Sequence, residues 1–209
     1  MAKTIITSNN ELLEDAYFSS LSVSTTAGDS TLTVYSISNF DTDDILLIGE
    51  FGQEGSEIIK AHDSTSPTGS TVTLTTTLSK SHPKDSKVYV IPYDQVQFYY
   101  STTSTGTKSL LATVDVDEED TETIYRDTTY SSGYYFTRFF NSTDLGYSEY
   151  SDPIPYGGFA SNTVGYLINL PLGETHKTTS SDLTYDMLLS EVNSCLRYVR
   201  GKLKRWSDT

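Results

Sequence analysis

The chain has 209 residues, enough for one large domain or two small ones, and only 36% of them are hydrophobic. Two small β domains with thin cores fit this balance better than one large core. The formal net charge is −14 and the sequence pI is about 4.4, which argues against a protein that coats DNA or anionic lipid. Such acidity serves either solubility or a surface to which DNA must not adhere, such as a channel wall.

Cysteine content and hydropathy indicate the compartment. Cys195 is the only cysteine, so an intrachain disulfide is excluded, which fits a reducing compartment or a protein stabilised by assembly. Residues 1–7 contain one lysine and one apolar pair, so no signal peptide is expected. The aliphatic run Ile45–Ile48 is far shorter than the roughly 20 residues that span a bilayer. We therefore expect a protein made and retained in the cytoplasm.

The first half of the chain predicts short strands. Residues 11–18 predict a short helix or an extended arm. Alternating or continuous apolar segments then follow, separated by Gly, Pro, Asn and Asp, which is typical of a small β-barrel or sandwich. The expected strands are 31–35, 45–50, 57–61, 71–75 and 87–91. The strand at 45–50 begins with the continuous apolar run Ile45–Ile48, so we expect both of its faces to be buried.

After Pro92 the expected strands become rich in aromatic residues. They are 95–100, 110–116, 122–126, 134–140 and 148–151. In the strand 134–140, alternation places Tyr134, Phe136 and Arg138 on one face. It places Tyr135, Thr137 and Phe139 on the other. This strand is either central in a sandwich or a platform on which sugar rings stack.

The C-terminal part differs in character. Residues 159–181 are rich in Ser and Thr and are interpreted as a linker, either a flexible tether or a strand added to a neighbour's sheet. After Thr184, which suits an N-cap, apolar residues recur at steps of three and four, which predicts an amphipathic helix. The apolar stripe comprises Leu188, Val192, Leu196, Val199, Leu203 and Trp206.

The end of this helix is strongly basic. The basic residues are Arg197, Arg200, Lys202, Lys204 and Arg205, and without these five the chain has a formal charge of −19, that is, −14 minus +5. They form either an ordinary solvated face or part of a docking surface. Because nothing in two small β domains would obviously cover the apolar stripe, we expect the helix to dock onto another subunit.

No catalytic, cofactor-binding or metal-binding constellation stands out in the sequence. His62, His82 and His176 are not at metal-ligand spacing to one another or to Cys195, which we interpret as a packing residue. The acidic run 115–120 offers oxygen ligands of the kind that Ca²⁺ prefers, but it lacks the glycine of an EF-hand loop. A solvated loop between strands is the better interpretation. No nucleophile–base pair stands out either, so we predict that the protein is not an enzyme.

Two stretches resemble known families. The segment from Phe40 to Glu50, with Ser56-Glu57-Ile58-Ile59-Lys60, is similar to a segment that recurs in virion proteins of tailed bacteriophages. The likeness continues through Thr/Leu strands at 71–78, the turn Ser81-His82-Pro83 and Ile91-Pro92-Tyr93.

The second stretch, residues 95–154, resembles a fibronectin type III or immunoglobulin-like module. The likeness lies in 130–136, Asn141, Gly146-Tyr147-Ser148 and Ser151-Asp152-Pro153. The tryptophan expected in such a module is missing, because the only one is Trp206. The module is therefore either truncated or completed by the preceding domain.

The expected architecture is mainly β with four parts. An N-terminal arm and small β-barrel-like domain (1–93) precede a fibronectin type III-like β-sandwich (94–158). The linker (159–181) and the C-terminal amphipathic α-helix (182–209) follow.

The resemblance implies a structural component of a tailed-phage virion, assembled in the host bacterial cytoplasm. The C-terminal helix resembles the segments by which head–tail adaptors attach to the portal ring. The leading hypothesis is therefore a neck or connector protein that forms a homo-oligomeric ring. Its partners would be the portal, adjacent tail or neck proteins and, in passing, DNA, with no membrane and no cofactor. The alternatives are another virion role, in the tail, baseplate or capsid decoration, and a carbohydrate-binding adhesin that uses the Tyr-rich module.

Overall fold

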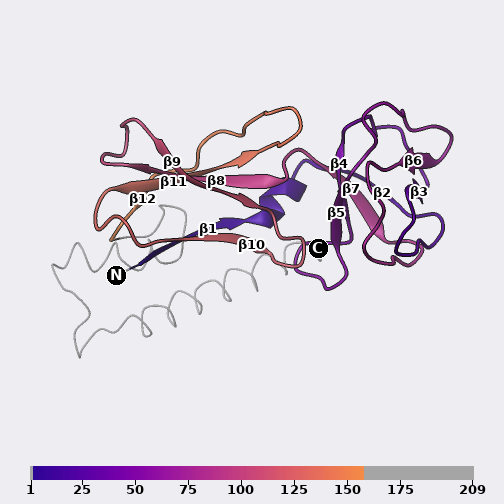
Figure 1. The fold of residues 1–209 in the computed structure, drawn as a ribbon, viewed down its shortest axis with the longest axis horizontal. Coiled ribbons are helices and arrows are strands. Elements are labelled where there is room, and N and C mark those ends of the chain that lie inside the picture. Colours follow the sequence, from indigo (N-terminus) through magenta and orange to yellow (C-terminus); the bar gives the residue numbers. More distant parts are fainter. Residues whose placement is uncertain (1, 158–209) are drawn as a thin grey trace, which may run out of the picture. The chain divides into compact units, whose positions relative to one another are not determined.

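The computed structural model describes residues 2–157, and this part of the chain is almost entirely β (Figure 1). It holds twelve short strands and one 3₁₀ helix, η1, so the expectation of a mainly β protein is confirmed. No helix in this range is long and apolar enough to cross a membrane. The predicted linker and C-terminal helix lie outside the described residues.

The chain divides into two compact units that interleave in sequence. The first comprises Met1–Tyr100, Thr107–Ser131 and Phe136–Ser151. The second comprises Ser101–Gly106, Ser132–Tyr135 and Asp152–Thr209.

Six strands of the first unit form a closed circuit of pairings. Four of them make an antiparallel sheet in the order β2 (Tyr17–Ser20), β7 (Lys87–Ile91), β4 (Ile45–Ile48) and β5 (Glu57–Lys60). The other two, β3 (Thr31–Thr33) and β6 (Thr71–Thr73), pair with each other. Isolated bridges at Leu21–Val34 and Ala61–Leu74 connect the two sheets at both ends. The circuit leaves few strand edges open, which limits pairing with foreign chains.

The core of this circuit is aliphatic. It includes Leu46 and Ile48 of β4, Leu32 of β3 and Val72 of β6, all with no exposed surface. Ile45 and Leu47 point to the opposite face of β4 and are also buried. The expectation that this apolar run is buried on both faces is therefore confirmed.

The rest of the first unit is built in two layers, visible in Figure 1. Strands β1 (Lys3–Ser8) and β10 (Glu122–Asp127) pair along their whole length. The other layer contains β8 (Gln95–Ser101), β9 (Ser109–Asp115) and most of β11 (Tyr134–Phe140). The rings of Phe98 and Tyr125 lie 5.3 Å apart between centroids and join the two layers.

The second unit is described only in small part. Its strand β12 (Ile154–Pro155) pairs antiparallel with the first residues of β11, Tyr134 and Tyr135. The amide of Tyr156 donates to the carbonyl of Gly133 at 2.8 Å and ends this short ladder.

The beginning of the chain differs from the prediction. Of residues 11–18, only 11–13 are helical, as the end of the 3₁₀ helix η1 (Asn9–Leu13), and β2 begins at Tyr17, so the segment is not a free arm. The strand β1 was not predicted at all. Its partner β10 lies more than a hundred residues further along the chain, so no local pattern announces the pairing.

The final strand predicted at 148–151 is also wrong. This segment runs beside β11, but serine hydroxyls replace part of the ladder. Ser148 and Ser151 each donate a backbone N–H to β11 and accept an N–H of β11 through the side-chain oxygen. Because the side chains take this role, the segment pairs without regular strand geometry.

The burial of β4 makes a direct prediction about stability. Replacing Leu46 with Ala should lower the free energy of unfolding by about 2–5 kcal/mol, because a fully buried side chain leaves a cavity. Leu110 on β9 is 52% exposed, and Leu110→Ala should cost less than about 1 kcal/mol. Urea denaturation of both variants checks this. Equal losses would contradict the assignment of β4 to the core.

Candidate functional site

The predicted docking residues cannot be located in space. The apolar stripe from Leu188 to Trp206 and the basic residues from Arg197 to Arg205 all lie outside the described residues, as do His176 and Cys195. Their roles stay predictions.

Part of the segment that resembles virion proteins forms one turn. Gly49 has a φ of 102°, and a Cβ there would overlap the Ser56 hydroxyl. That hydroxyl donates to the Glu50 carbonyl at 2.7 Å and accepts from the Glu50 amide at 3.1 Å. The Gly-Glu and Ser-Glu pairs of the resemblance therefore fix the hairpin between β4 and β5.

The next residue, Glu57, links this hairpin to the His-Pro turn. Its carboxylate accepts hydrogen bonds from the amides of Ser79 and Lys80, at 2.7 and 3.2 Å. It also lies 3.1 Å from His82 Nε2, and both side chains are buried. Burial alone would raise the pKa of Glu57, but these hydrogen bonds outweigh it, and the pKa lies below its ordinary value. The motif thus holds the start of β5 to the His-Pro turn.

The acidic loop 117–120 is engaged with the rest of the first unit. Lys80 Nζ lies 2.7 Å from Glu119 and 3.5 Å from Glu118, and it also donates to the Ser56 carbonyl at 2.6 Å. Burial acts to lower the pKa of Lys80, but the carboxylates of Glu119 and Glu118 raise it above its usual value. As expected, the loop lies between strands, β9 and β10, and Asp117, Glu119 and Asp120 are exposed to solvent; the contacts of Lys80 in addition hold it to the rest of the first unit. Within residues 2–157 no group of three or more His, Cys, Asp or Glu is placed to hold a metal.

The same loop holds the N-terminal segment through Asn9. The Asn9 amide group donates to the carbonyls of Asp117 and Asp120, at 3.2 and 3.0 Å. Its oxygen accepts a hydrogen bond from the Thr123 hydroxyl at 2.7 Å. Asn9 is fully buried and all of these polar atoms are used, so the loop, η1 and β10 are fixed together.

The aromatic strand β11 is mostly buried. Tyr135 and Phe136 expose 0% and 2% of their surface, which removes both from any platform for sugar rings. Tyr147 is half exposed, but its ring stacks on Phe140, and the guanidinium of Arg138 lies 3.7 Å from its centroid. Both features favour the interpretation of a central strand in a sandwich.

Arg138 is held in a polar and aromatic cluster. The Gln97 side-chain oxygen accepts hydrogen bonds from Arg138 Nε, at 3.2 Å, and from the Tyr99 hydroxyl, at 2.6 Å. The guanidinium also contacts the rings of Tyr99 and Tyr150, at 4.9 Å from each centroid. Burial raises the pKa of Tyr99, although the Arg138 charge opposes this. The cluster connects β11 to β8 through the side chains of Arg138, Gln97 and Tyr99.

An open cleft of about 530 Å³ lies between two turns of the first unit. One turn contributes Asp43 and Asp44, ahead of β4, and the other, after β11, contributes Asp144. Its apolar lining comprises Ile45, Val90, Ile91, Pro92, Tyr93 and Tyr147. The sequence analysis missed this cleft, because no local signal indicates that these two segments meet.

No family model, curated protein or solved structure matches this chain. The resemblance to phage virion proteins therefore rests on the residues of the chain itself. Their place in the hairpin and the His-Pro turn gives that pattern a physical reason.

The buried carboxylate of Glu57 predicts a pH dependence. Because its pKa is lower in the folded state than the ordinary 4.5, its contribution to stability is complete above about pH 4.5 and is lost as the pH falls through the folded value. Glu57→Gln should lower the free energy of unfolding at pH 7 by about 1–3 kcal/mol and flatten its decline in acid. Denaturant titrations from pH 7 to pH 3 measure both effects.

The matched control is Glu54→Gln, at an exposed position on the same hairpin. It should keep the parent's stability at pH 7 and its decline in acid. If Glu57→Gln behaves in the same way, the buried pair contributes nothing.

Proposed function

We propose that the chain is a structural component of a tailed-phage virion. It acts as a head–tail adaptor of the neck, repeated around a ring and docked to the portal through its C-terminal helix. The protein would work by assembly and not by catalysis. Its partners would be copies of itself, the portal and the adjacent tail proteins.

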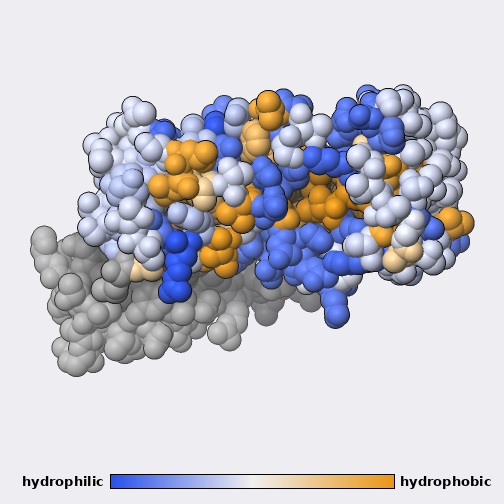
Figure 2. Space-filling view, viewed as in Figure 1, coloured by the Kyte–Doolittle hydropathy of each residue, from blue (hydrophilic) through white to orange (hydrophobic). Residues whose placement is uncertain are grey.

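The observation that carries this proposal is the apolar surface on regular strands. Ile6 and Ile124 are directly opposite each other on β1 and β10, and each is about half exposed, at 49% and 52%. On β2, Tyr17 and Phe18 expose 42% and 55%. Figure 2 shows apolar side chains as several separate patches within a polar surface. Apolar pairs on strands of this kind are typical of surfaces that a partner covers.

The use of the ionisable side chains supports the same proposal. The Glu, Lys and His residues of the resembling segments form ion pairs and hydrogen bonds within the body, as Glu57, Lys60 and His82 do. A scaffold fixed in this way suits a protein that must keep its shape in a ring. The side chains of Glu57, Lys60 and His82 are all engaged in these internal contacts.

The proposal extends to the architecture of the β strands. We interpret the closed circuit of β2–β7 as the small β-barrel, and the two layers after it as a fibronectin type III-like sandwich. Strand β1 would complete the sandwich, since it pairs with β10.

The test is the mass of the assemblies that the full-length protein forms with the portal ring of the same phage. Mass photometry should show a complex of fixed stoichiometry, and deletion of 182–209 should abolish it. Leu188→Ser with Leu196→Ser should weaken the complex at least tenfold, because both lie on the apolar stripe. Ser190→Ala with Ser194→Ala, on the same segment but off the stripe, should not. A protein that stays monomeric and ignores the portal at micromolar concentration would refute the adaptor role.

A further inference from the structure

The cleft in the first unit combines negative charge with an apolar floor. Asp43 has a φ of 64° and is exposed, and Asp44 lies beside it, partly buried. Asp144 approaches from the turn after β11 and accepts the Gly146 amide at 2.7 Å. Three carboxylates from two distant turns therefore surround apolar side chains of β4 and β7.

These carboxylates have no cationic partner among residues 2–157. The ion pairs of that region involve other acids, such as Asp94 with Lys60 at 3.2 Å. Lys60 pairs with Asp94 and also donates to the hydroxyls of Ser142 and Thr143, so it does not pair with the carboxylates of the cleft. Burial, and then the charges of Asp41 and Asp43, raise the pKa of Asp44, although the Asp41 amide opposes them. Within residues 2–157, therefore, no cation is paired with the carboxylates of the cleft.

Charge and shape together define the occupant. An amphipathic segment with several cations and a few apolar side chains would satisfy both parts of the cleft. A volume of about 530 Å³ takes a few side chains and not a whole helix. The partner is therefore the basic end of a segment.

The chain contains such a segment in its own sequence. Residues 2–157 carry 8 Lys and Arg against 23 Asp and Glu, a formal charge of −15. By contrast, residues 197–205 hold five cations in nine positions, interspersed with Val199 and Leu203 and followed by Trp206. This is the most basic stretch of the chain, and 39 residues separate it from the last described residue, Gly157.

We propose that the basic C-terminal segment of one copy binds in the acidic cleft of the next copy. The inference rests on the proposed ring and names the contact that builds it. Such a contact joins two different surfaces, so each copy offers one cleft and one tail. Repetition of a contact of this kind closes into a ring when the rotation between copies allows it.

Neutralising either side should break the contact. The cleft variant carries Asp43→Asn, Asp44→Asn and Asp144→Asn, because Asn keeps one side-chain oxygen that can accept the same backbone amide and tolerates the positive φ at position 43. The tail variant carries Gln at all five basic positions, 197, 200, 202, 204 and 205. Each should weaken self-association of the full-length chain at least tenfold, and added salt should weaken the parent in the same direction.

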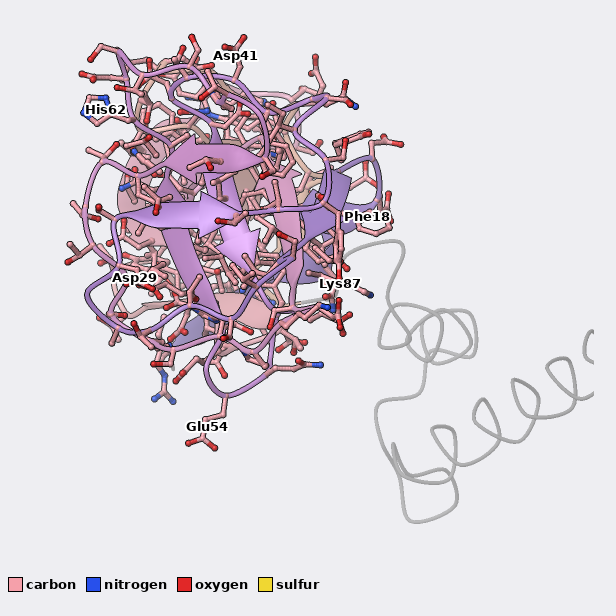
Figure 3. The ribbon with its side chains drawn as sticks, turned by 90° about the vertical axis from the view of Figure 1, so that its right-hand side faces the viewer. Phe18, Asp29, Asp41, Glu54, His62 and Lys87 are labelled. Atoms are coloured by element: carbon pink, nitrogen blue, oxygen red, sulfur yellow. The ribbon has the colours of Figure 1, made fainter. Side chains whose placement is uncertain are left out.

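The control removes the same amount of charge elsewhere. It carries Glu14→Gln, Glu54→Gln and Glu122→Gln, all at exposed positions. In Figure 3, Glu54 lies at the opposite end of the view from Asp41, whose amide binds Asp44. The control should assemble as the parent does.

Mixing the two variants is the decisive measurement. The cleft variant retains the unchanged C-terminal segment, and the tail variant retains the unchanged cleft. The mixture should therefore form a heterodimer of twice 23.2 kDa and nothing larger. Native mass spectrometry, with the two variants distinguished by mass, detects it. A mixture that stays monomeric, or a cleft variant that assembles like the parent, would overturn the inference.

This result is separable from the portal experiment. Self-association that depends on the cleft, without a portal complex, would retain the inference and remove the adaptor role. A portal complex formed by a chain that does not associate through the cleft would retain the adaptor role and remove the inference.

Discussion

One buried carboxylate, that of Glu57, begins a chain of polar contacts that connects several segments of the first unit. It accepts two backbone amides and lies against His82, so the start of β5 and the turn before β7 are held together. Lys80, in the same turn, binds Glu118 and Glu119 of the acidic loop. That loop in turn holds Asn9 and so places β1 beside β10. A charge buried in this way is favourable only while all its partners are present, because an unpaired buried charge costs several kcal/mol.

The acidic residues of the described part of the chain fall into two groups. Some acids, such as Glu57 and Glu119, bind specific partners within the first unit, His82 and Lys80. Others, such as Asp43 and Asp144, remain unpaired within residues 2–157 and give the surface its negative potential. The distinction matters for assembly, since only the second group can attract a cationic partner without weakening the fold.

Local patterns predicted most of the strands. The continuous apolar run of β4, the alternation in β7 and the aromatic run of β11 each indicated their element, because burial of neighbouring residues determines them. The hydroxyl-mediated pairing at Ser148 and Ser151 could not be predicted, since it depends on side chains that take over backbone hydrogen bonds. The cleft could not be predicted either, because Asp44 and Asp144 are a hundred residues apart and come together only in the fold. The C-terminal stripe remains a prediction from periodicity.

The pairing of β1 with β10 also determines an order of folding. The six-strand circuit lies within one continuous stretch, from Tyr17 to Ile91, and all its partners are available once that stretch has been synthesised. Strand β1 leaves the ribosome before this circuit, yet its partner is made more than a hundred residues later. The loop that must close is long, so this step should be slow and should come last. During synthesis the first strand is therefore an unpaired edge, and Ile5 and Ile6 make it a place where nascent chains can associate incorrectly.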